Sequence, residues 1–241
     1  LLIKMRIEGK KLKKVSNKVN ILESIDISIS SDSIYGLLGP NGAGKTSLFS
    51  ILAGLSKPSE GEVLYDSKIV NNLSFEKRSE LGVIYLPQEP SVFRELTVEE
   101  NIKAALEAKK YDKKEIDNKF SRISEEFDLM SIKTQKSNSL SGGQRRRVEI
   151  ARAIALNPKL ILLDEPFAGI DPLIINEIKT LIKNLKEKGI GVLISDHNVN
   201  ATLDICDYIY VINAGKVIAQ GIPNEIVQNE IVREVYLGEA T

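Results

Sequence analysis

A glycine-rich string between a strand-like run and a helix-like run constrains this chain more than any other feature. Residues 34–38 are apolar and predict a short strand, and residues 45–53 predict a helix. Between them stands Gly39-Pro40-Asn41-Gly42-Ala43-Gly44-Lys45-Thr46, which satisfies the pattern G-x-x-x-x-G-K-[ST] in the context that the pattern requires. The backbone of such a loop curls so that its N–H groups point at phosphate oxygens, and a helix N-terminus favours the same anion.

The string therefore predicts a nucleotide-phosphate site. Lys45 is expected to reach the β- and γ-phosphates, and the Thr46 hydroxyl is expected to bind Mg²⁺. The strand before the loop and the helix after it disfavour the alternative of an ordinary turn with a solvated lysine. The predicted nucleotide-binding residues are Gly39, Pro40, Asn41, Gly42, Ala43, Gly44, Lys45, Thr46 and Ser47.

A second apolar run, residues 159–163, ends at Asp164 and Glu165. Ligand sites of open parallel sheets gather at the carboxyl ends of the strands. Asp164 is expected to hold Mg²⁺, directly or through water. Glu165 points differently along the strand and is expected to act as the general base that polarises an attacking water. An acidic pair can also be a solvated strand end, but a phosphate loop in the same chain favours the catalytic interpretation.

Two more polar residues follow predicted strands. Gln88 comes just after residues 82–86 and could contact Mg²⁺ or the attacking water, although composition alone leaves an ordinary surface glutamine open. His197 is the only histidine in the chain, and it follows residues 191–195, where it could hydrogen-bond a γ-phosphate. A lone histidine is more often structural than catalytic, but a place directly after a core strand favours the catalytic role.

Composition sets limits on the class of protein. Lys+Arg and Asp+Glu both number 33, so bulk charge does not suggest a nucleic-acid binder. Cys206 is the only cysteine, which excludes an intrachain disulfide framework and favours a reducing compartment. No apolar run approaches the ~18 residues that would suggest a membrane span, and the opening residues are the reverse of a secretory signal. At a membrane, such a protein would need another chain to hold it there.

The order of predicted elements suggests a single domain over residues 1–241 with an insertion. Strands alternate with helices over about residues 1–87 and 158–241, which indicates a largely parallel sheet. Residues 88–157 predict three helices, expected over about 97–109, 112–130 and 142–156, that form an inserted helical subdomain. The residues expected to cap these helices are Thr97 with Glu100, Asp112 with Glu115, and Ser141.

The string Leu140-Ser141-Gly142-Gly143-Gln144-Arg145 completes a series of motifs that resembles the family of ABC ATPases from end to end. The resemblance implies an α/β nucleotide-binding domain with a P-loop (RecA-like) core, an antiparallel β subdomain and the inserted helices. It implies that the chain hydrolyses ATP with Mg²⁺ as a homodimer. It also implies that Ser141, Gly142, Gly143 and Gln144 contact the ATP held by the other subunit, and that Asp171 lies at the subunit junction.

Longer strings narrow the resemblance to the ATPase subunits of lipopolysaccharide exporters. Those subunits lie on the cytoplasmic face of the inner membrane beneath a pair of integral membrane subunits. By this resemblance Phe93 and Arg94 belong to a groove that receives a membrane subunit; the alternative for Phe93 is a loop aromatic packed on its own domain. The matching strings are residues 85–94, 145–153, 164–172 and 196–199, and the closing Val235-Tyr236-Leu237-Gly238-Glu239.

The chain departs from the family at the adenine site. Relatives usually place an aromatic residue upstream of the phosphate loop, where it stacks on adenine. The aligned position here is near Ser16, and no Phe, Tyr or Trp occurs before Tyr35. Loss of stacking predicts weaker or less base-selective adenine binding, by roughly 1–3 kcal/mol. The turn before residue 34 also lacks the glycine that the family often has there.

Three other interpretations remain. ATPases of branched-chain amino-acid importers also tend to end in Tyr-Leu-Gly, although residues 87–91 favour the exporter. A soluble ABC ATPase of the iron–sulfur assembly type lacks the matching strings. A clamp that does not hydrolyse ATP is disfavoured by Gln88, Glu165 and His197. Residues 145–147, all arginine, are expected to form a solvated helix face with one intersubunit contact rather than a nucleic-acid patch.

Overall fold

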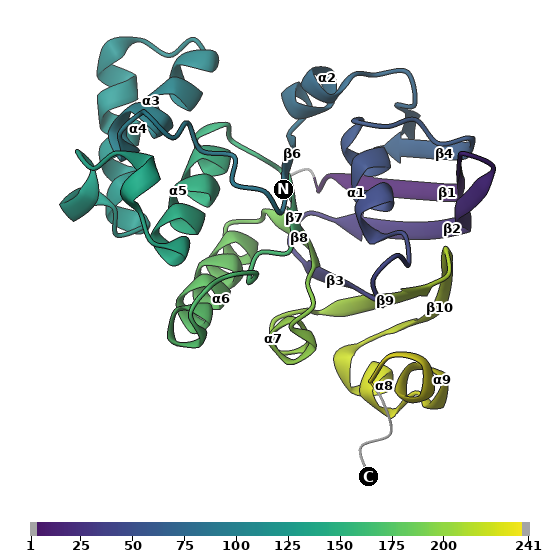
Figure 1. The fold of residues 1–241 in the computed structure, drawn as a ribbon. Helices are drawn as coiled ribbons and strands as arrows, with labels where there is room; N and C mark the ends of the chain where they lie inside the picture. The colour runs from purple at the N-terminus through teal and green to yellow at the C-terminus, as the bar shows by residue number, and fades with distance from the viewer. Residues whose placement is uncertain (1–3, 238–241) are drawn as a thin grey trace.

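The computed structural model describes residues 4–237 and arranges them as two sheets with a separate group of helices (Figure 1). One sheet has six strands in the order β10-β9-β3-β8-β7-β6. All pairs in it are parallel except β9 with β10, so the carboxyl ends of β3, β6, β7 and β8 meet at one edge. The strands are β3 (Ile34–Leu38), β6 (Val83–Leu86), β7 (Leu160–Asp164), β8 (Gly191–Ser195), β9 (Tyr208–Asn213) and β10 (Lys216–Gly221).

The second sheet is antiparallel, with the order β2-β1-β4-β5. Its longest strand, β2, alternates between its two faces: Ile25, Ile27 and Ile29 are buried, whereas Asp26 and Ser28 are not. An antiparallel β subdomain beside a parallel core confirms the predicted fold class. The strands are β1 (Arg6–Ser16), β2 (Val19–Ser30), β4 (Glu60–Tyr65) and β5 (Lys68–Ile69).

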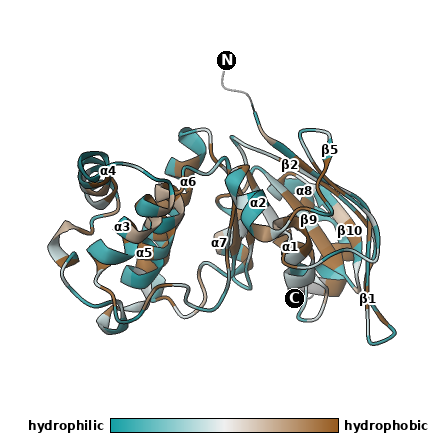
Figure 2. Ribbon diagram, turned by 90° about the horizontal axis from the view of Figure 1, so that it is seen from above, coloured by the Kyte–Doolittle hydropathy of each residue, from teal (hydrophilic) through white to brown (hydrophobic). Residues whose placement is uncertain are grey.

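Three helices form a group beside the six-stranded sheet (Figures 1 and 2). They are α3 (Val98–Ala108), α4 (Lys113–Glu126) and α5 (Gly142–Ala155), and α5 packs against β6. All three predicted caps are present, and each is a complete capping box. The prediction that the second helix reaches residue 130 is wrong: it ends earlier because Asp128 takes a left-handed φ of 51°. The boundaries 88–157 of a helical subdomain stay a prediction.

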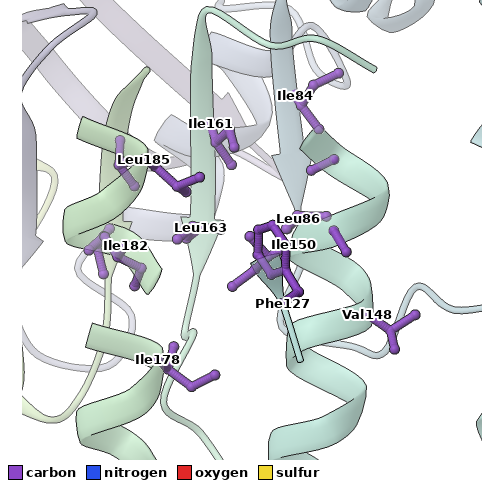
Figure 3. Packing of buried hydrophobic residues seen from close by; sticks show 14 of the residues in the cluster. Ile84, Leu86, Phe127, Val148, Ile150, Ile161, Leu163, Ile178, Ile182 and Leu185 are labelled. Carbon is purple, nitrogen blue, oxygen red and sulfur yellow. The ribbon is translucent and has the colours of Figure 1, made fainter. Parts of the chain in front are cut away.

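Side chains of β7 alternate between two buried clusters. Ile161 and Leu163 face the cluster that includes α5, α6 (Pro172–Glu187) and Phe127, as Figure 3 shows. Leu160 and Leu162 face the other cluster, which packs α1 (Lys45–Ala53) and the antiparallel sheet against the core. A strand buried on both faces accounts for its continuous apolar run. The strand end at Asp164 is thereby held between two packed layers.

The remaining elements are short. They are α2 (Phe75–Glu80), η1 (Met130–Ile132), η2 (Ser137–Ser139), α7 (Val199–Leu203), α8 (Pro223–Gln228), α9 (Glu230–Val232) and η3 (Arg233–Leu237). Within residues 4–237, no helix combines the length and apolarity needed to cross a membrane. The closing string that begins at Val235 runs beyond the described residues after Leu237.

Candidate nucleotide site

The phosphate loop joins β3 to α1 at the edge where the parallel strands end. Gly39 and Gly44 both have positive φ, at 151° and 106°. A Cβ atom at Gly39 would lie 2.1 Å from the carbonyl oxygen of Ile212, and one at Gly44 would lie 2.8 Å from that of Ile21. Glycine is therefore required at both positions by steric contact as well as by backbone conformation.

The loop and three residues from other parts of the chain line one cavity of about 310 Å³. Lys45 is buried, and its Nζ donates hydrogen bonds to the carbonyl oxygens of Gly39 (2.7 Å) and Pro40 (3.0 Å). Burial lowers the pKa of Lys45, while the nearby carboxylates of Glu165 and Asp164 oppose that shift. The cavity is lined by Ile21, Asn41, Gly42, Gly44, Lys45, Thr46, Ser47, Glu165 and His197.

Asp164 lies at the carboxyl end of β7 and is buried. Its Oδ2 accepts a hydrogen bond from the Tyr85 hydroxyl at 3.2 Å. Burial raises the pKa of Asp164 above its usual value, although hydrogen bonds from Tyr85 and Thr46 oppose that shift. Among the described residues, no three His, Cys, Asp or Glu side chains group as a metal site. The oxygen donors Thr46 and Asp164 suit Mg²⁺ if phosphate oxygens complete the shell.

Glu165 and His197 are in direct contact, which the sequence did not predict. Glu165 Oε1 lies 2.7 Å from His197 Nε2; the carboxylate side chain is 12% exposed and the imidazole 50%. The backbone N–H of Glu165 donates to the carbonyl of Ser195 across the ends of β7 and β8. Glu165 also has a φ of 49°, a left-handed conformation that is costly for a residue with a side chain. Such strained residues cluster at functional sites.

Asp196 is a residue that sequence reasoning missed. It is buried, and its two carboxylate oxygens accept the backbone N–H groups of Phe167 and Asn198, both at 2.8 Å. Phe167 lies two residues after Glu165, and Asn198 lies directly after His197. Asp196 therefore ties together the two loops that bring the carboxylate and the imidazole into contact. Burial raises the pKa of Asp196, and the two backbone hydrogen bonds oppose that shift. A polar residue between a buried strand and the lone histidine was the available signal.

We expect Asp196→Asn to lower kcat by about 10- to 100-fold with little change in KM, because an amide accepts only one of the two bonds and misplaces Glu165. Steady-state ATP hydrolysis measures both constants, and a thermal melt reports folding. Asp204→Asn is the matched control, since Asp204 is exposed and forms only a surface ion pair. An unchanged kcat in folded Asp196→Asn would contradict the role.

The string at residues 141–144 lies outside the phosphate cavity. Ser141 caps α5, and its Oγ accepts the N–H of Gln144 at 3.2 Å. A Cβ atom at Gly142 would lie 2.9 Å from the carbonyl of Gly169, and one at Gly143 would lie 2.5 Å from Ile174. The two glycines therefore let the start of α5 pack against the segment that leads into α6.

Gln88 is brought near Glu165 but not into the phosphate cavity. A second cavity, of about 340 Å³, is lined by Gln88, Gly142, Glu165 and Gly169 among others. Glu165 lines both cavities and so lies between the phosphate loop and the start of α5. Asp171 is exposed and caps α6, with its Oδ1 accepting the N–H of Leu173.

The expectation of a solvated arginine face at residues 145–147 is wrong. Arg146 is 6% exposed and pairs with Glu149 at 2.9 Å, which neutralises it one turn further along α5. Its guanidinium also donates to the carbonyl of Asp164 at 3.4 Å. Arg147 pairs with Asp128 and Glu177, so its charge is also matched locally. These arginines hold α5 against its neighbours.

Phe93 is only partly packed on its own domain. The ring is 52% exposed and lies against the Arg152 guanidinium, whose central carbon is 4.7 Å from the ring centroid. Arg94 is also exposed. Arg152, on which the Phe93 ring lies, also lines an apolar cavity of about 270 Å³ together with Ser91 and residues of α2 and β6.

The sequence position at which relatives are expected to carry an adenine-stacking aromatic lies near Ser16. Ser16 ends β1, and its neighbours Val15 and Val19 are exposed. Tyr35 is used elsewhere: its hydroxyl lies 2.9 Å from Ser30 Oγ, and its ring packs edge-on against Tyr208. Weaker adenine stacking near Ser16 therefore stays a prediction.

Family models and solved structures that resemble this chain indicate the same kind of nucleotide-binding domain. The family model described as ABC transporter matches residues 22–168, and one described as branched-chain amino acid ATP-binding cassette transporter matches residues 216–241. A nucleotide-free ATP-binding cassette from an ABC transporter has a TM-score of 0.88 and 30% identity, covering 98% of this chain and 100% of its own. A dimeric cassette in a post-hydrolysis state with ADP and Pi has a TM-score of 0.80 and 27% identity, covering 90% and 98%.

Curated relatives are more similar in sequence. The lipopolysaccharide export system ATP-binding protein LptB of Haemophilus influenzae is 47% identical over 220 residues, 91% of each chain. The protein of the same name from Escherichia coli K12 is 44% identical over 232 residues, 96% of each chain. The chain therefore belongs to the family of ABC transporter ATP-binding proteins and is an ATPase.

Proposed function

We propose that this ATPase powers lipopolysaccharide export, as a homodimer beneath integral membrane subunits on the cytoplasmic face of the inner membrane. The observation that carries the proposal is identity of 44–47% to lipopolysaccharide export ATP-binding proteins over 91–96% of the chain. The exposed ring of Phe93, which lies on an arginine that lines an apolar cavity, supports contact with another chain. Matched bulk charge makes nucleic acid an unsuitable partner.

In the proposed mechanism each residue of the phosphate cavity has one task. The loop N–H groups and Lys45 bind the phosphates, and Lys45 must exchange its bonds to Gly39 and Pro40 for phosphate oxygens. Thr46 and Asp164, with Gln88 after domain movement, would hold Mg²⁺, which neutralises phosphate charge. Glu165 accepts a proton from the attacking water, and His197 Nε2 would exchange its contact with that carboxylate for a hydrogen bond to the γ-phosphate.

A second copy would complete each site. The start of α5, with Ser141 to Gln144, does not line the phosphate cavity of its own chain. Its N–H groups and helix dipole favour an anion, so a partner's γ-phosphate can bind there. Two copies related by a twofold axis would satisfy both sites with one chain type. Asp171 at the exposed start of α6 would then lie at the junction.

The function is tested by recovery of partners from solubilised membranes of the source cell. Glu165→Gln protein with ATP is the bait, and Lys45→Ala protein is the control that should not form the ATP-bound state. Recovery of lipopolysaccharide-export membrane subunits is the expected result. Recovery of an amino-acid permease, or of soluble partners only, would overturn the proposed cargo while leaving the ATPase intact.

Phe93→Ala is expected to weaken association with the membrane subunits by at least about tenfold and to leave hydrolysis by the isolated chain unchanged, since a half-exposed aromatic is a typical interface anchor. Co-purification of the complex measures the first quantity. Leu55→Ala, which truncates an equally exposed residue after α1, is the control. Unchanged association would remove Phe93 from the groove.

A branched-chain amino-acid importer is the second candidate. It is favoured by one observation, the match of residues 216–241 to the corresponding C-terminal family model. That match covers 26 residues, whereas the exporter relatives match 220 and 232. The longer similarity includes the Phe93 loop and the phosphate cavity, which is why export is preferred.

A further inference from the structure

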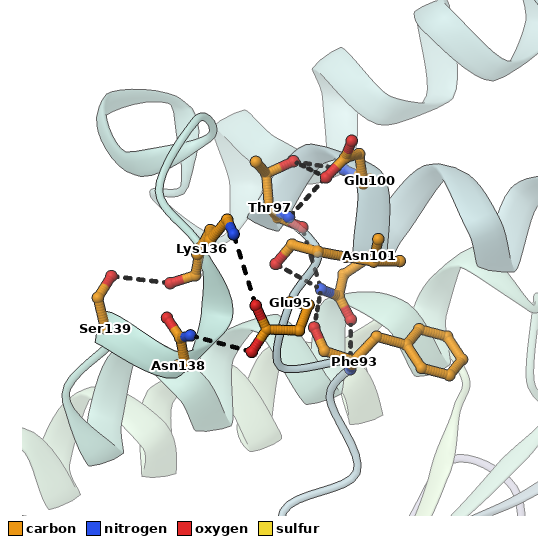
Figure 4. A network of polar contacts seen from close by, with 9 residues as sticks. Phe93, Glu95, Thr97, Glu100, Asn101, Lys136, Asn138 and Ser139 are labelled. Carbon is orange, nitrogen blue, oxygen red and sulfur yellow. Dashed lines mark hydrogen bonds and ion pairs between the residues drawn. The ribbon is translucent and has the colours of Figure 1, made fainter.

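Asn101 of α3 is a fully buried amide that bonds to the start of its own helix, at the carbonyl of Thr97, and also to two segments outside the helix. Its Oδ1 accepts the N–H of Phe93 at 2.9 Å, and its Nδ2 donates to the carbonyl of Phe93 at 3.0 Å. The same Nδ2 also donates to Ser137 Oγ at 2.9 Å. Figure 4 shows this amide at the centre of a polar network. One side chain therefore holds both backbone groups of Phe93 and a residue 36 positions further along the chain.

The two segments that meet at Asn101 also pair through their backbones. Ser137 N–H donates to the carbonyl of Leu96 at 3.0 Å, and Asn138 N–H donates to that of Arg94 at 3.1 Å. Around them Thr97 and Lys136 form an antiparallel bridge. Residues 93–99 and 133–138 therefore pair as a short two-stranded segment, called the connector here. The Asn101 side chain bonds to both of its strands.

The connector leads directly to the start of α5. Ser137 begins the turn η2, in which Ser139 Oγ and N–H both contact the carbonyl of Lys136. Leu140 follows and is buried, so it anchors the chain, and Ser141 then caps α5. Only three residues therefore lie between Ser137 and Ser141, and hydrogen bonds or burial restrain the path between them.

We infer that Asn101 is a positioning residue that couples the Phe93–Arg94 loop to Ser141, so that docking of a membrane subunit and closure on the partner's ATP move as one event. The inference rests on the proposed roles of Phe93, Arg94 and Ser141. It adds a route between them that does not pass through Gln88. Asn101 lines neither the phosphate cavity nor the second cavity, so it would act by holding the connector in place and not by contact with the nucleotide.

Hydrogen exchange of the full chain tests this coupling without any membrane subunit. In Glu165→Gln protein, ATP is expected to slow exchange in residues 139–146, at the partner interface, and also in residues 92–97. Adding Asn101→Leu, which keeps the side-chain volume but removes every bond, should abolish the ATP-dependent slowing in 92–97 and leave it in 139–146. Adding Ser137→Ala, a smaller change, should reduce it in the same segment.

Asn118→Leu is the matched control, because Asn118 is exposed on the neighbouring helix α4 and should leave both responses intact. If ATP slows exchange in neither segment of Glu165→Gln protein, the result contradicts the proposed dimer and therefore also the coupling that depends on it. Two outcomes would keep the dimer and overturn the coupling. In the first, ATP slows exchange of Glu165→Gln protein only in residues 139–146. In the second, ATP still slows exchange in residues 92–97 after both Asn101→Leu and Ser137→Ala.

Discussion

Glu165→Gln is expected to lower ATP turnover by roughly 10²- to 10⁴-fold, the usual contribution of a general base. The amide is nearly the same size but cannot accept the proton of the attacking water. ATP affinity should change little, because the phosphate loop and Lys45 are untouched. Phosphate release under saturating ATP measures turnover, and equilibrium binding of labelled ATP measures affinity.

Two features make Glu165 the carboxylate on which this result depends. It contacts His197 at 2.7 Å and lines both cavities at the strand edge. Glu187→Gln, on the exposed end of α6, is the control and should keep full turnover. Normal turnover in Glu165→Gln would assign the base to another group.

Arg78→Met is expected to destabilise the protein by about 3–5 kcal/mol, the largest stability effect that we predict for a single side chain. Arg78 is fully buried and donates to the carbonyls of Ile51, Leu52, Val70 and Leu73. Methionine fills similar space but removes all four hydrogen bonds that the buried guanidinium donates. At about 2–4 °C per kcal/mol, the melting temperature should fall by roughly 10 °C.

Thermal unfolding followed by circular dichroism checks this prediction. Arg122→Met is the matched control, because Arg122 is exposed on α4 and its loss should change stability by less than about 0.5 kcal/mol. Arg78→Lys keeps the charge but not the planar fork, so an intermediate loss is expected. A melting temperature equal to that of the control would contradict the account of α1, whose last carbonyls Arg78 binds.

Local signals carried most of what the sequence could predict. The phosphate loop is fixed by its glycines, and the caps at Thr97, Asp112 and Ser141 are short-range patterns that the structure confirms. The end of α4 was harder, because no glycine marks the left-handed turn at Asp128. A non-glycine residue in that conformation gives no composition signal.

Long-range contacts were beyond the sequence pattern. The burial of Arg146 depends on Glu149 within its own helix and on the carbonyl of Asp164, which arrives from a strand. Asp196 and Asn101 look like ordinary polar residues until the fold places backbone groups of distant loops beside them. Periodicity and spacing report which face a residue occupies, but they do not report its partners across the fold.

The central claim is that each ATP is bound between Lys45 of one copy and Ser141 of the other, and mixing two inactive variants tests it most directly. Lys45→Ala and Ser141→Arg proteins should each have little turnover alone. A mixed dimer contains one site with both residues intact, so turnover should appear on mixing at a rate that neither protein shows. No gain on mixing, or full activity of Ser141→Arg alone, would contradict the shared site.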